Sequence, residues 1–411
     1  MSDSGTPRSR TDGPADSREG RRLSRARIST DPWARPSRPT GSPRPSRSPA
    51  PTKVHTATMY THADPHDLRH HGDAEVRDIA AHMTDLAVNV RTDTPPEWLR
   101  ERIAASLMTL AAYPDGRSAR AAVAARHGLP VERVLLTSGA AEAFVLLARA
   151  LKVRHPLVVH PQFTEPEAAL RDAGHTVRRL VLREEDGFRL DPSAVPESAD
   201  LVMIGNPTNP TSVLHPAADI ASLARPGRLV VVDEAFMDAV PEEYETLAGR
   251  TDVPGLVVLR SLTKTWGLAG LRVGYVLAPA EVIAELERAQ PLWPVSTPAL
   301  IAAEVCMSPA ALKEAEQAAG LIAVERAHLL AGLAEFDEVR VVANAEASFV
   351  LAHVRRGAEV RERLRSLGFA VRRGDTFPGL GPSWLRIAVR DRVTTNRFLQ
   401  ALDQSLTMVG C

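Results

Sequence analysis

Cysteine is scarce in this sequence: Cys306 and Cys411 are the only two among 411 residues. Their separation fits no zinc-ligand spacing and two cysteines allow at most one disulfide, so we expect neither a disulfide framework nor a metal site. The chain also lacks a run of about 18 apolar residues that could span a membrane. The arginines near the N-terminus are not followed by the apolar stretch of a signal peptide. We therefore expect a cytoplasmic protein with no membrane partner.

A net charge is also missing, because 50 basic residues balance 50 acidic ones. The basic residues are not evenly spread, since residues 1–55 are rich in Arg, Ser and Pro. Such a composition cannot bury enough apolar surface to offset the entropy of ordering the chain, so we expect a disordered basic tail. The rest of the chain is then mildly acidic, and nucleic acid is not expected as a partner.

After the tail, short apolar runs alternate with helix-like stretches. The runs at 201–204, 229–232 and 256–259 contain no polar residue, which is typical of strands buried on both faces of a parallel sheet. Later, an Ala-, Glu- and Leu-rich stretch over 300–336 predicts one extended helix, followed by strands and a helix up to residue 389. The sequence thus predicts an α/β fold: a large domain with a mostly parallel central sheet, and a smaller C-terminal α+β domain.

We place the large domain at residues 101–290 and the small domain at 291–411. Residues 56–100 are expected to form an N-terminal arm that contributes to the small domain and to the active site. Several of the predicted strands end in a short polar turn. Open α/β sheets bind their ligands at this carboxyl edge, so candidate functional residues are sought there.

The segment that carries chemistry covers residues 261–274, Ser-Leu-Thr-Lys-Thr-Trp-Gly-Leu-Ala-Gly-Leu-Arg-Val-Gly. It directly follows a predicted strand and places Lys264 near the hydroxyls of Ser261 and Thr263, with Arg272 further on. An amine that is desolvated beside other cations loses its proton more readily and can form an imine. Hydroxyls and a guanidinium are suitable ligands for a phosphate. For an isolated Lys–Arg pair, solvated loop charges would be the better interpretation.

Position by position, this segment resembles the lysine signature of the class I and II aminotransferases. Over roughly residues 75–405 the chain is similar to fold-type I enzymes that use pyridoxal 5′-phosphate (PLP), in the branch of the histidinol-phosphate aminotransferases and threonine-phosphate decarboxylases. The resemblance implies an aspartate aminotransferase-like fold in which residues 101–290 form the PLP-binding domain. It also implies that Lys264 carries the cofactor as a Schiff base.

The cofactor phosphate is expected to have five ligand residues. Ala140 and Ala141 lie where a predicted strand gives way to a helix, and backbone N–H groups at a helix N-terminus bind anions. By the resemblance, Ser261 and Thr263 add two hydroxyls and Arg272 adds a guanidinium.

Three further residues are expected around the cofactor ring. Phe163 matches the family's aromatic residue stacked on the ring. Asn209 matches the residue that binds the cofactor's phenolic oxygen, in a turn where Ser212 replaces the family's glycine. Asp233 ends an apolar strand, where a carboxylate is costly to bury, and would pair with the pyridine nitrogen and keep it protonated. Without the resemblance, Phe163 would be taken as a core residue and Asn209 as part of a plain turn.

Three more residues concern the substrate and the oligomer. Arg386 matches the family arginine that grips the substrate α-carboxylate with two hydrogen bonds. Arg372 is a candidate ligand for a distal substrate phosphate, or else a surface charge. Tyr113 matches a tyrosine that reaches the cofactor phosphate of the neighbouring subunit, which implies a homodimer.

The sequence leaves two reactions open. Phe236 stands where aminotransferases of this family usually have Tyr, and its context, together with residues 259–264 and 291–296, resembles the threonine-phosphate decarboxylases of cobalamin biosynthesis. The turn at 70–73 also resembles that branch, with His71 replacing a glycine. Our first hypothesis is decarboxylation of L-threonine O-3-phosphate, and the alternative is transamination of histidinol phosphate or another amino acid with 2-oxoglutarate. A cofactor-free binding protein is disfavoured because the residues that carry the cofactor chemistry are all present.

Overall fold

The computed structural model describes residues 68–70 and 83–410. The predicted tail over residues 1–55, the first part of the N-terminal arm and the turn at 71–73 lie outside this part of the chain. Within the described ranges, no helix combines the length and apolar character needed to cross a membrane. In the same ranges, no group of three or more His, Cys, Asp or Glu side chains is placed to hold a metal ion.

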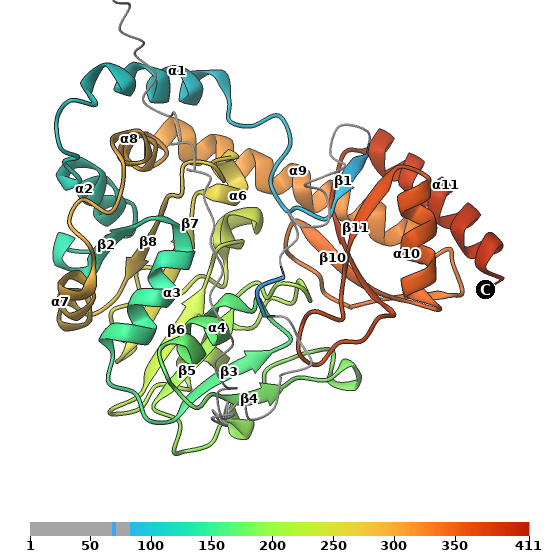
Figure 1. Cartoon of the computed structure of the whole chain (residues 1–411), viewed down its shortest axis with the longest axis horizontal. Helices are drawn as coiled ribbons and strands as arrows, with labels where there is room; N and C mark the ends of the chain where they lie inside the picture. Colours follow the sequence, from blue (N-terminus) through green and yellow to red (C-terminus); the bar gives the residue numbers. More distant parts are fainter. Residues whose placement is uncertain (1–67, 71–82, 411) are drawn as a thin grey trace, which may run out of the picture. The chain divides into compact units, whose positions relative to one another are not determined.

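A seven-stranded sheet forms the centre of the larger part of the fold (Figure 1). In the order in which they pair, its strands are β2 (Val134–Thr137), β8 (Gly274–Leu277), β7 (Leu256–Ser261), β6 (Leu229–Asp233), β5 (Leu201–Gly205), β3 (Pro156–His160) and β4 (Arg178–Val181). β8 is antiparallel to both of its neighbours, and the other pairs are parallel. The predicted mostly parallel sheet is confirmed, although β8 was not among the predicted strands.

The central strands β5, β6 and β7 each begin with four apolar residues because both of their faces are covered. Along β6, Val230 and Val232 pack into one apolar core, whereas Val231 packs into the other. Side chains of an extended strand alternate between faces, so a strand between two helix layers needs an unbroken apolar run. One layer contains α1 (Glu97–Ser106), α2 (Arg117–Arg126), α5 (Ala217–Ala221) and α8 (Thr297–Val305), and the other contains α3 (Gly139–Ala150), α4 (Glu165–Asp172) and α7 (Ala280–Ala289).

A second, five-stranded sheet lies in the C-terminal part of the chain. Its order is β1 (Thr84–Leu86), β11 (Phe369–Arg373), β12 (Trp384–Ala388), β10 (Phe349–Val354) and β9 (Val339–Val341). β1 pairs in parallel with β11, so the segment before α1 joins a sheet built almost wholly from late residues. The helices α10 (Gly357–Ser366), α11 (Arg392–Val409) and the last turns of α9 (Pro309–Leu333) share its apolar core.

The single helix predicted over residues 300–336 is wrong. α8 ends at Val305 and α9 begins at Pro309. The Oγ of Ser308 accepts a hydrogen bond from the backbone N–H of Ala311 (3.3 Å), and a proline is well suited to the first position of a helix, where an N–H has no partner. Because α8 shares the core of the large sheet and the described residues form one compact unit, the domain division at residues 290 and 291 stays a prediction.

Candidate active site

The carboxyl ends of β5, β6 and β7 open into a cavity of about 390 Å³. This is the sheet edge at which α/β folds bind ligands, and the volume suits a small cofactor and substrate. Most of the residues predicted from the sequence meet there: Ala140, Ala141, Phe163, Asn209, Asp233, Ser261, Thr263, Lys264, Arg272 and Arg386 all line the cavity.

Lys264 reaches the cavity from a short, well-anchored helix. β7 ends at Ser261, and α6 (Thr263–Trp266) follows at once and stops at Gly267, whose φ is +66°. A Cβ on Gly267 would lie 2.2 Å from Thr94 Oγ1, so only glycine fits this turn. The carbonyl oxygen of Lys264 accepts a hydrogen bond from the N–H of Arg91 (3.0 Å). The backbone of Lys264 is therefore held by the tight turn at Gly267 and by the hydrogen bond from Arg91.

One end of the cavity is suited to a phosphate. α3 starts at Gly139, and the N–H groups of its first turn include those of Ala140 and Ala141. The guanidinium of Arg272 lies against this helix start, because a Cβ on Gly139 would be 2.8 Å from its Nη2. The backbone of Arg272 is left-handed, with a φ of +55°, a conformation that residues other than glycine adopt at a cost in free energy. A helix N-terminus, a guanidinium and the hydroxyls of Ser261 and Thr263 together make an anion site.

A partly buried carboxylate, that of Asp233 at the end of β6, lines another part of the cavity. Its Oδ1 accepts a hydrogen bond from the N–H of Ala235 (3.1 Å). Burial raises the pKa of Asp233 to about 6, while the Ala235 hydrogen bond and the charge of Lys264 partly oppose this increase. A carboxylate with a perturbed pKa in a cavity that also holds a lysine is typical of a functional site.

Aromatic rings form two walls of the cavity. Phe163 packs beside Phe144, with 6.3 Å between ring centroids. Phe236 is packed edge-to-face on Phe349 at 4.9 Å, and Lys264 Nζ lies 5.6 Å from the centroid of the Phe236 ring. Since Phe236 has no hydroxyl, this wall offers no hydrogen-bond donor beside the lysine.

Asn209 and Arg386 are in direct contact at the side of the cavity that adjoins the small sheet. Arg386 Nη1 donates to Asn209 Oδ1, and Nη2 donates to the carbonyl oxygen of Ala87. Because its oxygen is occupied by Arg386, Asn209 has its NH₂ group left to donate to a ligand. The guanidinium also lies over the ring of Phe349, 5.3 Å from the centroid, so the orientation of Arg386 is well determined.

Two predicted site residues do not line this cavity. Arg372 is 2% exposed and donates to Thr376 Oγ1 (2.7 Å) and to the carbonyl oxygen of His70 (2.8 Å), so the alternative of a surface charge is wrong. It does face Arg386 across β11 and β12. Tyr113 is 75% exposed and stacks on Trp293, with 4.1 Å between centroids. Its predicted role concerns a second subunit and stays a prediction.

Comparison with known proteins identifies the family. The profile described as "Aminotransferase class I and II" matches residues 81–402. This chain belongs to the class I and II aminotransferase family. Among its relatives, a histidinol-phosphate aminotransferase of Mycobacterium bovis is 48% identical over 78% of this chain and 87% of its own length. A threonine-phosphate decarboxylase of Salmonella typhimurium is 28% identical over 80% of this chain and 92% of its own length.

The fold agrees with this assignment. The aspartate aminotransferase of Thermus thermophilus has a TM-score of 0.72 to this chain, at 21% identity, over 82% of this chain and 95% of its own. The predicted aspartate aminotransferase-like fold is therefore confirmed. Enzymes of the class I and II aminotransferase family depend on PLP.

Ser212 shows how this family member accommodates a residue that replaces glycine. Its φ is +64°, which favours glycine. The serine hydroxyl oxygen accepts a hydrogen bond from the N–H of Ala347 (2.8 Å), and its carbonyl oxygen accepts one from the N–H of Glu346 (2.8 Å). These bonds to the segment before β10 offset part of the strain of the left-handed conformation.

Sequence reasoning assigned residues 56–100 to an arm that contributes to the active site, but it singled out none of residues 87–90, the segment between β1 and α1 that lines the cavity. Arg390 holds its start, donating from Nη2 to the carbonyl oxygen of Val88 (2.8 Å) and from Nε to that of Asp85 (3.2 Å). Asn89 is buried, and with its amide oxygen turned to Arg386 it accepts from Nε (3.3 Å) and Nη1 (3.2 Å). A buried amide after the apolar run Leu86-Ala-Val was the available signal, by the same logic that singled out Asp233.

Proposed function

We propose that the chain is a PLP-dependent enzyme whose cofactor occupies the 390 Å³ cavity and is linked to Lys264. In this proposal Ala140, Ala141, Ser261, Thr263 and Arg272 hold the phosphate, and Phe163, Asn209 and Asp233 hold the ring. The observation that carries the proposal is that Lys264 and the carboxylate of Asp233 line one cavity, with the anion site of α3 on its wall. This donor set fits PLP, which needs an amine, a phosphate ligand and an acceptor for a protonated ring nitrogen.

When bound, PLP supplies an electron sink that allows one bond at the amino-bearing carbon of the substrate to break. The residues of the chain decide which bond breaks. Arg386 orients the substrate by its carboxylate, and Asn209 and Phe163 fix the plane of the ring. With PLP bound, the amine of Lys264 would be the group that moves a proton at the substrate carbon.

Phe236 in the cavity wall, and Arg372 on the strand beside Arg386, support decarboxylation of L-threonine O-3-phosphate as the reaction, although Arg372 itself does not line the cavity. The Phe236 wall lacks the donor that aminotransferases usually have beside the lysine. The two arginines that face each other on β11 and β12, Arg372 and Arg386, match a substrate with both a phosphate and a carboxylate. A place in cobalamin biosynthesis and a cytoplasmic location stay predictions.

Transamination is supported by a different observation, the sequence identity to known relatives. The relative that is 48% identical to this chain is a histidinol-phosphate aminotransferase, a higher identity than the 28% of the threonine-phosphate decarboxylase. In one half-reaction, Arg372 and Arg386 would bind the phosphate of histidinol phosphate. In the other half-reaction, they would bind the carboxylates of 2-oxoglutarate.

The cofactor proposal is tested by reducing purified protein with borohydride and mapping the adduct by mass spectrometry. A phosphopyridoxyl group on the Lys264 peptide is the expected result, and its absence contradicts the proposal. Lys264→Ala should lose the adduct and the visible absorbance after dialysis. Lys152→Ala, which removes an exposed lysine after α3, should keep both.

The reaction is tested by its products. CO₂ release from threonine phosphate without a keto acid supports decarboxylation. Glutamate formation from histidinol phosphate and 2-oxoglutarate, without CO₂ release from threonine phosphate, overturns decarboxylation and supports transamination. Arg386→Lys keeps the charge but loses the two-pronged contact, so it should raise KM for either carboxylate substrate by about 100-fold.

We also propose a homodimer in which Tyr113 reaches the cofactor phosphate of the partner. Several large apolar side chains close in sequence to Tyr113 or to its stacking partner Trp293 are exposed, namely Leu107, Met108, Leu110 and Leu292. Exposed apolar side chains beside an exposed aromatic pair suit a protein interface. Sedimentation should show a dimer for the wild type and a monomer for Met108→Asp/Trp293→Asp, and a monomeric wild type contradicts the proposal.

A further inference from the structure

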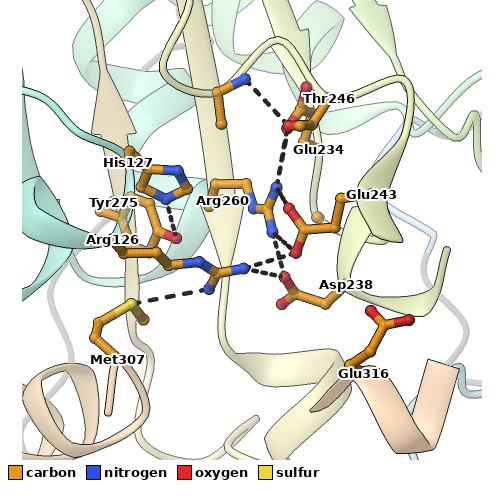
Figure 2. A network of polar contacts seen from close by, with 12 residues as sticks. Arg126, His127, Glu234, Asp238, Glu243, Thr246, Arg260, Tyr275, Met307 and Glu316 are labelled. Atoms are coloured by element: carbon orange, nitrogen blue, oxygen red, sulfur yellow. Dashed lines mark hydrogen bonds and ion pairs between the residues drawn. The ribbon is translucent and has the colours of Figure 1, made fainter. Parts of the chain in front are cut away.

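A buried network of charged side chains lies next to the proposed cofactor site (Figure 2). Its members are two arginines and three carboxylates: Arg126, Arg260, Glu234, Asp238 and Glu243. None of these five lines the 390 Å³ cavity, and the chemistry proposed above does not use them. Asp238 does line a second cavity that Lys264 also borders. Buried charge is costly, so its presence here calls for a reason.

Two pairs of sequence neighbours connect the network to the site. Asp233 and Ser261 line the cavity, whereas the adjacent Glu234 and Arg260 are about 1% exposed and do not. Side chains alternate along extended strands, so each pair sends one residue to the cavity and one away from it. The N–H of Glu234 donates to the carbonyl oxygen of Leu259 (2.9 Å), which continues the pairing of β6 with β7 past Asp233.

The Glu234 carboxylate is held on both oxygens. Oε2 accepts from Arg260 Nη1 (3.0 Å) and from Thr246 Oγ1 (2.6 Å), and Oε1 accepts from the N–H of Leu247 (2.6 Å). Arg260 also donates to the two oxygens of Glu243 (2.9 and 2.8 Å). Neither side chain can move without breaking several charge-assisted bonds, so the ends of β6 and β7 are fixed relative to each other.

The far side of the network balances the charge. Arg260 donates to Asp238, and Arg126 donates to the same carboxylate (3.1 Å) and to Glu243 (2.6 Å), as Figure 2 shows. Without Arg260, Arg126 would be the one arginine left in the network, and it pairs with Asp238 and Glu243 but not with Glu234. The carboxylate nearest to Asp233 in sequence, Glu234, would lose its ionic partner.

We propose that Arg260 and Glu234 are positioning residues for the cofactor site: their ion pair fixes Asp233 and Ser261 at the cavity wall and neutralises the charge behind Asp233. This inference rests on the proposed function, because Asp233 is the partner of a ring nitrogen only if PLP binds there. The two residues touch neither cofactor nor substrate and act through their neighbours.

The charges around Asp233 predict the direction in which its pKa should change. Burial is the main cause that raises the pKa of Asp233, and the charge of Glu234 adds to it. Arg260 in turn opposes the effect of burial on the pKa of Glu234. The charged groups on or behind Asp233 are Lys264 of α6, Glu234, Arg260 of β7, Arg126 of α2, and Asp238 and Glu243 between them. Removing the charge of Glu234 should therefore make Asp233 easier to ionise. Removing Arg260 takes away the ionic partner of Glu234 and the hydrogen bond that ties β7 to Glu234.

The test compares two variants that break the same ion pair, using the dissociation constant of PLP between pH 5.5 and 8. Arg260→Met should weaken PLP binding by about tenfold at pH 6.5, because the ends of β6 and β7 are no longer tied together by the ion pair. Glu234→Gln removes the charge that raises the pKa of Asp233, so it should move the pH profile of PLP binding downward. Arg260→Met that binds PLP like the wild type, or a Glu234→Gln profile that does not move, overturns the proposal.

Control variants separate positioning from stability. Arg228 is also about 2% exposed and fully engaged, but with carbonyl oxygens near the other end of β6, so Arg228→Met should lower Tm and leave PLP binding unchanged. If Arg260→Met does not fold, the Glu234→Gln profile decides: an unmoved profile overturns the proposal. A wild type that binds no PLP overturns the proposed function as well, whereas variants that bind like the wild type overturn this inference alone.

Discussion

Arg272 and Gly139 approach each other so closely that a methyl group on Gly139 would lie 2.8 Å from Nη2 of the arginine. Gly139 also has a φ of +75°. Gly139→Ala must therefore displace the guanidinium from the start of α3. Since both parts of the anion site are affected, we expect PLP affinity to fall by about 100-fold, measured by fluorescence titration.

A matched control isolates the displacement from the backbone strain. Gly128 has a φ of +62°, and a methyl group added to it would meet no atom within 4 Å. Gly128→Ala pays the same conformational cost, about 1 kcal/mol, and should leave PLP binding intact. Equal binding by the two variants would show that the Arg272 contact does not matter.

Asp233 should make the cofactor-free protein less stable as the pH rises. Burial raises its pKa to about 6 from an ordinary 3.8, so between these values the folded chain binds more protons than the unfolded chain. The free energy of unfolding then falls as pH increases through this window, by on the order of 3 kcal/mol. In Asp233→Asn this fall should be absent in urea titrations at pH 4.5 to 7. The exposed Asp403→Asn serves as control, and parallel curves for wild type and Asp233→Asn would refute the expectation.

Phe236→Tyr should change the cofactor linkage. A phenol beside Lys264 can donate to the phenolic oxygen of bound PLP and stabilise its negative charge, so the pH midpoint of the visible band should fall by about one unit. The share of transamination relative to decarboxylation should increase. Phe236→Leu also lacks a donor and should not lower the midpoint. A midpoint that falls equally in both variants would mean that packing on Phe349 is the cause.

Cys306 should be inert in the folded protein. Its side chain is 0% exposed, and burial raises the pKa of its thiol well above the ordinary range. In a Cys411→Ser variant, a thiol reagent should therefore find no reactive group under native conditions and one group in guanidinium chloride. Rapid reaction of the native variant would show that the core around α8 opens readily.

The parts of the fold that could be predicted are those with a local signal. The strands around β6 were predictable because burial on both faces demands an unbroken run such as 229–232. β8 was not predictable because it has four residues and begins with a glycine, so it offers no unbroken apolar run like those of its neighbours. The break between α8 and α9 was encoded by Ser308 and Pro309, a helix-start signal that the surrounding Ala- and Leu-rich composition concealed.

The candidate site divides in the same way. Lys264, Asp233 and Asn209 lie in contiguous motifs just after predicted strands, so the family resemblance of these motifs could assign them to one site. Asn89 depends on β1 joining β11, a pairing between distant segments that no local pattern indicates. The burial of Arg372 likewise follows from its contact with the carbonyl oxygen of His70, 302 residues away in sequence.

The segment at 87–90 has a consequence for the order in which the enzyme is built. Its contacts with Arg386 and Arg390 join residues separated by 299 and 302 positions. A growing chain emerges from the ribosome N-terminus first, so these arginines are made long after the segment that they clamp. The large sheet, which carries Lys264 and Asp233, can form earlier. The part of the proposed site that contains Arg386 and residues 87–90 can form only when nearly the whole polypeptide has been made. Nascent chains that end before Arg386 should thus pass through a stage in which the cofactor pocket is shaped while its substrate side is still unmade.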